Sequence, residues 1–457
     1  MLIVLALAGL SLHLARRKPP PIPSTDPDME RLAPAIRAYR QIQQRAFDPP
    51  TTRAAVRGAI EGLVEAVDEY SVYIPPDKAE RVAGGMNGEA FETGLRCVVL
   101  PDGRLGVAGV LPGSPAAKAG LSSTLCVVSV NGTDVKFMTA EEVRQVLQGG
   151  QRPVEVRVMP RKGGPEEVYR LKPAAFDVDT VTGTHRAADG RWVHTFPDAP
   201  GIAYLRVTEF AQPTPAEFHQ TYQKLDRPRG LVLDLRGNPG GRLDAAVEIA
   251  DRFIDEGLIV RTVSRHHEPQ SHVAHESTTY PPVPMVVLVD EETASAAEIV
   301  AGALQARGRA VLVGMPTRGK WSIQSTFDLG EGLGQMYVTT GRYLLPERPT
   351  TRPATATETA PAIATATAPA GEERLLPDVP ARLTDQDRLD LRRWRMLGSL
   401  KPQIDAGQEG KEEEQSWREE VGRNVLRSDL QLARALKVLA EGQAPATTRP
   451  AREPEDD

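Results

Sequence analysis

Short apolar runs alternate with amphipathic segments through the second half of the chain, and glycine-containing polar turns separate them. The runs 231–235, 285–289 and 310–313 are almost wholly apolar and predict buried strands. Segment 244–254 has the pattern of an amphipathic helix, and within 289–305 the apolar residues Ile299, Val300, Ala303 and Leu304 recur at helical spacing before Gly308 ends the helix. The chain therefore passes twice from a buried strand through a polar turn into a helix.

Ser295 lies at the second of these strand-to-helix turns. A serine there stands clear of the backbone at a helix N-terminus, where free N–H groups stabilise an anion. Lys320 follows 25 residues later, after a turn that contains proline and glycine. We expect Lys320 to open another strand, on which Lys320, Ser322 and Gln324 share one face because strand side chains alternate.

This pair suggests nucleophilic chemistry. A serine hydroxyl is a poor nucleophile until a base removes its proton. Lys320 can be that base only when neutral, so its pKa must fall from about 10.4 to roughly 7–8 through desolvation. Gln324 would orient the amine by hydrogen bonding. A structural interpretation stays open, since Ser295 and Glu298 fit a helix capping box and Lys320 fits an exposed loop residue.

The first strand-to-helix turn holds two consecutive glycines, Gly240 and Gly241, after a proline. Glycines allow backbone N–H groups to approach a ligand closely. Such a turn would supply one arm of an oxyanion hole, and the N–H of Ala296 would supply the other. A plain turn between strand and helix is the alternative.

Residues 86–172 carry the pattern of a separate β-rich module. We expect strands, turns and helices over 94–100, 106–120, 127–135, 141–148 and 154–160. This order resembles a PDZ domain, which adds an extended peptide to a sheet edge and binds its terminal carboxylate on backbone N–H groups. Gly94, Leu95, Arg96 and Cys97 would line that groove. A β-rich scaffold without peptide affinity is the alternative.

Five segments together resemble the carboxyl-terminal processing proteases, also called tail-specific proteases. The segments are DLRGNPGG at 234–241, ASAAEIVAGALQ at 294–305, GKWSIQ at 319–324, VDEYSVYI at 67–74 and SPAAKAGL at 114–121. Their order makes the resemblance specific. It covers roughly residues 35–345 and again 374–440.

The resemblance implies a serine endopeptidase that cleaves proteins or peptides near their C-termini, without a metal or another cofactor. It implies an α/β fold with a ClpP/crotonase-like core and a PDZ-like domain inserted before that core. Ser295 would be the nucleophile, Lys320 the base and Gln324 the orienting residue. The PDZ-like domain would bind the C-termini of protein or peptide substrates.

Four positions depart from the family pattern. Trp321 stands where the family usually has glycine, and Arg318 stands where phenylalanine is common. Neither change removes a catalytic group, and Arg318 adds positive potential that favours a neutral Lys320. Thr124 and Leu125 replace the usual Gly-Asp before a strand of the PDZ-like module, which puts that turn in doubt rather than the domain.

The chain divides into seven expected segments. They are a signal peptide or short anchor at 1–18, a helical region packing on the core at 29–85, the PDZ-like domain at 86–172, the protease core at 173–346, a Thr/Ala/Pro-rich disordered insertion at 347–373, the end of the core with a C-terminal helical region at 374–440, and a disordered tail at 441–457. Within the helical region, Ile60, Leu63, Val64 and Val67 are expected to share one buried face.

The apolar N-terminus is short for a membrane span and lacks the basic region that begins a signal peptide. Basic residues follow the apolar run instead of preceding it. Residues 2–14 are nonetheless a candidate for membrane attachment. The family resemblance favours the periplasm or cell envelope.

Composition excludes some partners. The 55 basic and 61 acidic residues give a net charge of −6, and the basic residues are dispersed, so no nucleic-acid partner is indicated. The two cysteines, Cys97 and Cys126, are expected as buried thiols, with a disulfide as the alternative. The His-rich loop 266–275 lacks a regular zinc-ligand spacing. A Ser-His-Asp site built on His185, His194 or His219 is also disfavoured.

Two other function classes compete with an autonomous protease. One is a catalytically silent PDZ adaptor on a protease scaffold, against which the presence of both Ser295 and Lys320 argues. The other is a protease whose active site assembles only with an activating adaptor. Activity measurements on the two candidate residues distinguish these classes.

Overall fold

The computed structural model describes residues 27–100, 102–148, 152–187, 189–330, 332–346, 374–400 and 429–445. The predicted N-terminal segment 1–18 and the predicted insertion 347–373 lie outside these residues. The chain forms two compact units. We call them the smaller unit (residues to 82, with 263–268 and 322–343) and the main unit (83–262, 269–321 and from 344).

A seven-stranded sheet forms the centre of the main unit. Its parallel strands are β14 (Ala199–Val207), β15 (Gly230–Asp234), β18 (Met285–Val289), β19 (Val311–Gly314) and β22 (Val379–Pro380), in that spatial order. Two short strands, β10 (Val181–Thr182) and β13 (Thr195–Phe196), pair antiparallel with β14. Every residue of β15 and β18 is buried, as expected for parallel strands covered on both faces. The sequence pattern predicted β15, β18 and β19 to within one residue.

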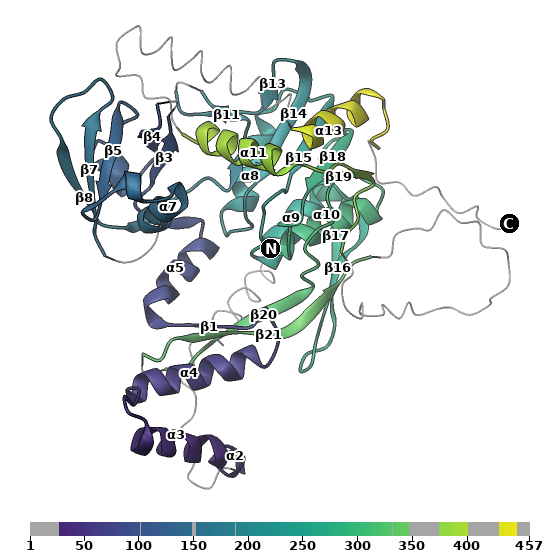
Figure 1. Cartoon of the computed structure of the whole chain (residues 1–457). Coiled ribbons are helices and arrows are strands. Elements are labelled where there is room, and N and C mark those ends of the chain that lie inside the picture. The colour runs from purple at the N-terminus through teal and green to yellow at the C-terminus, as the bar shows by residue number, and fades with distance from the viewer. Residues whose placement is uncertain are drawn as a thin grey trace, which may run out of the picture. The chain divides into compact units, whose positions relative to one another are not determined.

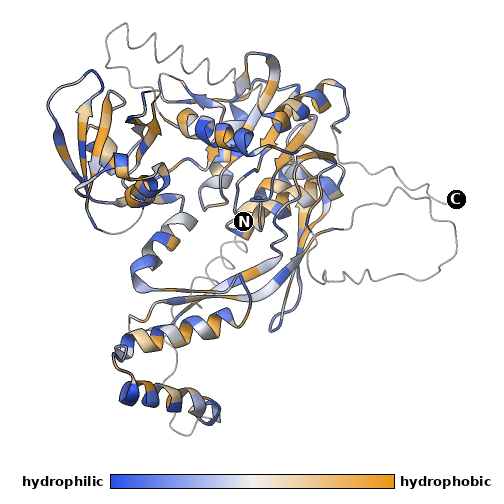
Figure 2. Ribbon diagram, in the orientation of Figure 1, coloured by the Kyte–Doolittle hydropathy of each residue, from blue (hydrophilic) through white to orange (hydrophobic). Residues whose placement is uncertain are grey.

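Helices cover both faces of this sheet (Figure 1). The helix α13 (Leu430–Ala440) packs through Leu432, Ala435 and Val438 against alternate residues of β15, β18 and β19. Strand side chains alternate, so the intervening residues face α9 (Leu243–Asp251) and α10 (Ala296–Ala306), which pack against each other. Figure 2 shows the hydrophobic residues concentrated in these strands and helices.

Four further elements complete the core region. They are α8 (Thr214–Gln223), the antiparallel hairpin of β16 (Glu256–Ser264) and β17 (Gln270–His275), and α11 (Asp385–Gly398). Thr384 caps α11 by accepting a hydrogen bond from the N–H of Asp387 at 3.1 Å.

Residues 86–172 form an antiparallel sheet and a helix around their own apolar cluster. The elements are β3 (Leu95–Val99), β4 (Leu105–Val110), α6 (Pro115–Lys118), β5 (Leu125–Val130), β6 (Thr133–Asp134), α7 (Ala140–Gln148), β7 (Val154–Pro160) and β8 (Glu167–Leu171). The predicted Asn-Gly turn is confirmed, because Asn131 and Gly132 have φ of 49° and 80° between β5 and β6. Both cysteines are free thiols, so the disulfide alternative is wrong.

Two further strands pair antiparallel: β2 (Glu89–Glu92), which precedes β3 within residues 86–172, and β9 (Ala174–Asp177), which follows directly after them. Their pairing places the chain segments that lead into and out of the β3–β8 sheet side by side. The elements that the sequence pattern predicted occur in the predicted order, and β2 and β8 are strands that it did not predict.

The smaller unit contains α2 (Pro27–Arg31), α3 (Ala33–Arg45), α4 (Thr52–Glu65) and the antiparallel strands β1 (Val72–Ile74), β20 (Ser322–Asp328) and β21 (Gln335–Leu344). A fourth helix, α5 (Pro76–Met86), continues into the main unit. The predicted buried face of α4 is wrong in part, because Val64 is buried whereas Leu63 and Val67 are 61% and 51% exposed. One helical residue rotates by about 100°, so Leu63 points away from the face of Val64, and Val67 lies beyond the end of α4 at Glu65.

Candidate active site

Ser295 lies where β18 passes through a tight turn into α10. Its backbone has φ of 58° and ψ of −121°, which is a left-handed conformation for a residue that carries a side chain. Such a conformation costs on the order of 1–3 kcal/mol and persists only where the surrounding structure holds it. The turn therefore presents Ser295 at the N-terminus of a helix whose eleven residues are all buried.

The glycine-containing turn after β15 lies directly against Ser295. At Gly240 (φ 101°), a Cβ atom would come within 2.7 Å of the Ser295 Cβ and 2.9 Å of the Ala296 nitrogen. Only glycine fits this approach. The structure thus brings together three of the residues that the sequence singled out, from segments 55 residues apart.

The backbone N–H groups of this turn differ in their partners. The Gly240 N–H donates to the Asn238 side-chain oxygen at 2.8 Å, so the prediction that it serves the oxyanion hole is wrong in this structure. Among the described residues, neither the Gly241 N–H nor the Ala296 N–H has a hydrogen-bond acceptor. The predicted oxyanion-hole role of the Gly241 and Ala296 N–H groups stays a prediction.

Asn238 fixes the turn and went unnoticed in the sequence. It is fully buried, and its side-chain nitrogen donates to the Val207 carbonyl at 2.9 Å. Its own carbonyl accepts a hydrogen bond from the Ala294 N–H at 3.0 Å, which joins the glycine turn to the serine turn. An asparagine before proline and two glycines is typical of a turn, so no local pattern indicates this second role.

A single buried carboxylate, that of Glu298, joins the serine turn to the lysine loop. One of its oxygens accepts from the Ser295 N–H at 2.8 Å and from the Lys320 N–H at 2.9 Å. The other accepts from the Thr317 hydroxyl at 2.5 Å and from the Gly319 N–H at 2.7 Å. Four donors therefore meet at one side chain with no exposed surface.

The capping-box interpretation is confirmed on the glutamate side, because Glu298 at the third position of α10 accepts from the Ser295 N–H. That contact does not exclude the nucleophile interpretation. The same carboxylate also reaches 22 residues along the chain to Lys320, which a cap does not require.

Lys320 lies half-buried in an extended loop, not in a strand. The prediction that Lys320 opens a strand is wrong, since β20 begins at Ser322. The loop is held at its backbone: besides the Glu298 contacts, the Arg318 N–H donates to the Thr293 carbonyl at 2.9 Å. The backbone N–H groups of this loop therefore donate to the Glu298 carboxylate and the Thr293 carbonyl, and not to a neighbouring strand as the pattern predicted.

Gln324 lies on β20 in the smaller unit. Its side-chain nitrogen donates to the hydroxyls of Ser322 at 2.7 Å and Thr339 at 3.1 Å. These contacts fix the amide within its own sheet, and its predicted orienting role toward Lys320 stays a prediction.

A buried ion-pair cluster lies next to the glycine-containing turn, at the end of β15. Arg236 has no exposed surface and donates to the carboxylates of Asp234 and Asp429, the latter capping α13 at Leu432. Burial by itself raises the pKa of Asp234, but Arg236 and Arg395 outweigh it and hold that pKa well below its usual range. The strand end before Gly240 is thereby tied to the C-terminal helix.

The predicted peptide groove lies at the start of β3. Gly94 has φ of 75° and packs against Ser114, and Leu95 is buried. The guanidinium of Arg96 is paired with Glu92 at 2.6 Å, so its charge is already engaged. Burial raises the pKa of the Cys97 thiol to about 12.

Two of the histidines considered for a Ser-His-Asp site, His194 and His219, lie beside tyrosine oxygens. His194 Nδ1 lies 3.1 Å from the Tyr204 carbonyl, and His219 Nδ1 lies 2.8 Å from the Tyr280 hydroxyl. Among the described residues, no group of three or more His, Cys, Asp or Glu side chains is placed to hold a metal ion.

Comparisons with known proteins match this arrangement. A model of peptidase family S41 matches residues 201–357, and a PDZ-domain model matches residues 106–158. The carboxyl-terminal-processing protease of Picosynechococcus sp. is 34% identical over 307 residues, which are 65% of this chain and 70% of that protein. The chain belongs to the carboxyl-terminal-processing proteases of peptidase family S41.

Other members of the family are similarly related. The carboxyl-terminal-processing protease of Synechocystis sp. is 32% identical over 315 residues, 65% of this chain and 69% of the relative. The carboxy-terminal processing protease CtpA of Bacillus subtilis is 28% identical over 300 residues, 65% of this chain and 61% of the relative. As a family member with a PDZ domain, the chain is a protease that acts on proteins or peptides.

The described part of this protease contains no helix with the length and apolar character that a membrane span requires. The predicted anchor at residues 2–14 falls outside the described residues.

Proposed function

We propose that this protease is a serine endopeptidase that cleaves near the C-termini of its substrates, with Ser295 as nucleophile and Lys320 as base. The observation that carries the proposal is the Glu298 oxygen shared by the Ser295 N–H and the Lys320 N–H. One buried atom fixes the backbones of both residues, so their relative position is set before substrate arrives. Prepositioned groups lower a reaction barrier because their ordering is completed during folding.

The reaction follows from these positions. The neutral Lys320 amine takes the Ser295 hydroxyl proton as the oxygen attacks the peptide carbonyl. The developing oxyanion accepts hydrogen bonds from Gly241 and Ala296, in the space that the missing side chain at Gly240 leaves open. Lys320 then donates its proton to the leaving amine, and water attacks the acyl-enzyme in the same manner. Gln324 holds the amine in this proposal.

The wider assignment rests on the fold and on the relatives. The parallel order of β14, β15, β18, β19 and β22, with helices on both faces, supports a ClpP/crotonase-like core. The PDZ match supports recognition of substrate C-termini along β3, at Gly94 to Cys97. We further propose that the protein works in the periplasm or cell envelope.

The decisive test is cleavage of an unfolded protein with an apolar C-terminus, measured over pH 6–10. Ser295→Ala and Lys320→Ala should both abolish cleavage, whereas Lys172→Ala, a change at an exposed lysine, should leave it unchanged. In the wild type the rate should rise with pH as an amine deprotonates. Cleavage that survives Ser295→Ala would overturn the mechanism.

Two alternatives predict other outcomes of the same experiment. A silent PDZ adaptor would bind the substrate C-terminus without cleavage in any variant or with any partner. A protease that needs an activating adaptor would be inactive alone and would gain Ser295-dependent cleavage when cell-envelope extract is added.

A further inference from the structure

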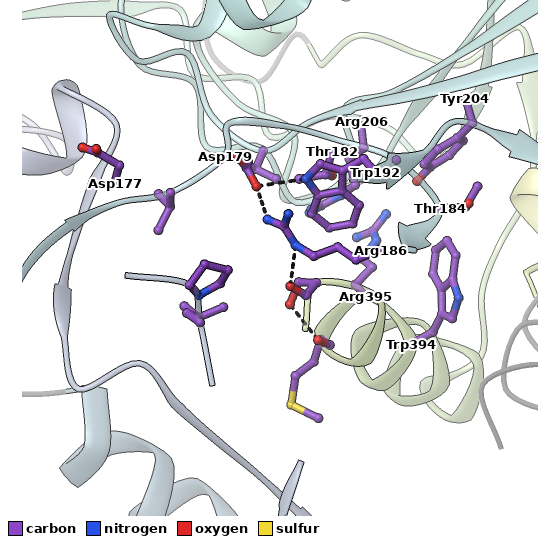
Figure 3. A pocket seen from close by; sticks show the side chains of 17 residues that line it. Asp177, Asp179, Thr182, Thr184, Arg186, Trp192, Tyr204, Arg206, Trp394 and Arg395 are labelled. Atoms are coloured by element: carbon purple, nitrogen blue, oxygen red, sulfur yellow. Dashed lines mark hydrogen bonds and ion pairs between the residues drawn. The ribbon is translucent and has the colours of Figure 1, made fainter. Parts of the chain in front are cut away.

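A cavity of about 440 Å³ lies in the main unit beside β14 and α11 (Figure 3). Three arginines from different elements line it: Arg186 on β11 (His185–Arg186), Arg206 on β14 and Arg395 on α11. We call this cavity the arginine pocket. None of its lining residues belongs to the proposed catalytic or peptide-binding sets.

One arginine that lines the pocket has no carboxylate partner among the described residues. The Asp234 carboxylate accepts hydrogen bonds from Arg236, from Arg395 at 3.0 Å and from the Tyr204 hydroxyl at 2.7 Å. Asp429 is occupied by Arg236. Three guanidiniums, those of Arg206, Arg236 and Arg395, therefore face two carboxylates, and one positive charge remains without a carboxylate partner within this cluster.

The remaining charge belongs to Arg206. Its hydrogen-bond partner in the described structure is the carbonyl of Arg236, at 3.4 Å. The carboxylate of Glu292 lies near Gly237, as the Arg206 and Arg395 side chains do, and it is paired with Arg392 at 3.8 Å. Burial, with Arg395 close by, lowers the pKa of Arg206 to about 10. The side chain still carries its charge at neutral pH, and it lines the pocket together with Arg395, whereas the carboxylates of the lining are those of Asp177 and Asp179.

Two donors in the pocket are unsatisfied. The Nε–H groups of Arg206 and Arg395 are buried, and neither has a hydrogen-bond acceptor among the described residues. A buried donor without an acceptor costs about 1–3 kcal/mol. An anion beside these two guanidiniums would offset the excess charge and bring acceptors to the same place.

The rest of the lining limits the kind of ligand. Asp179, the carboxylate nearest to Arg186, is already engaged by that arginine and by the Trp192 ring N–H at 2.9 Å. Trp192 and Trp394 present aromatic rings to the cavity. The volume is in the range of about 300–1,000 Å³ that small-molecule sites occupy, which leaves room for an apolar group beside an anionic head.

We propose that the arginine pocket binds a small organic oxyanion, a carboxylate or a phosphate monoester, through Arg206 and Arg395. The head group lies between the two guanidiniums, and Trp192 and Trp394 contact the apolar part of the ligand. This site is independent of the proposed catalytic residues, so its occupancy is measurable whether or not the protein cleaves the test substrate.

Calorimetric titration of the full chain with phenyl phosphate and with benzoate tests the proposal at ionic strength held constant with sodium chloride. At least one probe should bind saturably, and which one binds distinguishes a phosphate head from a carboxylate head. Arg206→Gln should weaken that binding at least tenfold. Arg170→Gln, a change at an arginine that is 80% exposed on β8, should leave it unchanged.

Arg206→Lys provides a second test in case Arg206→Gln does not fold. Lysine keeps the charge but loses the planar fork, so we expect affinity to fall roughly fivefold. The proposal is overturned if neither probe binds the wild type, or if the folded Arg206 variants bind as tightly as the wild type.

Discussion

The Glu298 carboxylate accepts a hydrogen bond from the Ser295 N–H at 2.8 Å, and the oxygen that does so also accepts from the lysine loop. The glutamate that caps α10 thus also connects the serine turn to the lysine loop, and the proposed reaction requires these two segments to be aligned. This relationship leads to the first prediction.

Glu298→Gln should lower kcat at least 100-fold with little change in KM. The amide keeps one acceptor oxygen, and its NH₂ group then faces two backbone donors. Ser295 and Lys320 move apart as a result, and a displacement of about 1 Å is enough for a loss of this size. Steady-state kinetics on a peptide substrate measure the effect. Glu292→Gln, a change at an exposed carboxylate three residues before Ser295, is the matched control and should retain full activity.

Gly240→Ala should remove activity because the new Cβ would overlap Ser295. The alanine Cβ would lie 2.7 Å from the Ser295 Cβ, and the φ of 101° strains any residue with a side chain. We expect a loss of about 1–3 kcal/mol in unfolding free energy together with the loss of cleavage. Gly58→Ala is the control, since its Cβ would meet nothing within 4 Å on α4, and it should be neutral or stabilising by about 0.5–1 kcal/mol. Normal activity in Gly240→Ala would contradict the site geometry.

Ser295→Gly should give a more stable protein than Ser295→Ala, although both lack cleavage. Alanine keeps the strain of φ 58°, whereas glycine adopts that conformation freely. The difference should be about 1 kcal/mol in unfolding free energy. Denaturant unfolding of the two variants measures it, and equal stability would show that the turn is not strained.

Asp234→Asn should destabilise the protein by about 3–5 kcal/mol, because it leaves Arg236 incompletely paired in a site without exposed surface. The native pKa of Asp234 is lowered, so its contribution is present above the unfolded value of about 3.9 and is lost as pH falls toward the native pKa. The difference in Tm between wild type and variant should therefore narrow below about pH 4. Asp244→Asn, which breaks an exposed pair with Arg242, should cost less than about 1 kcal/mol.

The Cys97 thiol should react slowly in the folded protein. Burial raises its pKa to about 12, so the thiolate that attacks a disulfide reagent is scarce at pH 8. Labelling should be slower than that of an exposed cysteine by roughly a thousandfold and should become fast in denaturant. Rapid labelling of the native protein at residue 97 would contradict the raised pKa of this half-buried thiol.

Local patterns were enough to find the elements that carry the site. The apolar runs of β15 and β18 and the helical spacing of α10 predicted the two strand-to-helix turns. The runs are easy to recognise because strands buried on both faces are apolar at nearly every position. The lysine loop was misread as strand since extended loops and strands share a sequence pattern. In that loop the backbone hydrogen bonds go to Glu298 and Thr293 and not to a neighbouring strand.

The amino-acid sequence alone determined the family, the order of the elements, the module at 86–172 and the identities of Ser295 and Lys320 as candidates. These features depend on residue type and on spacing along the chain. Tertiary structure alone decided that Gly240 lies against Ser295, that Asn238 takes the Gly240 N–H, and that one Glu298 oxygen serves both catalytic candidates. It also placed Arg206 beside Arg395. Contacts between residues tens of positions apart arise when strands pair and helices pack, and no periodicity records which donor will meet which acceptor.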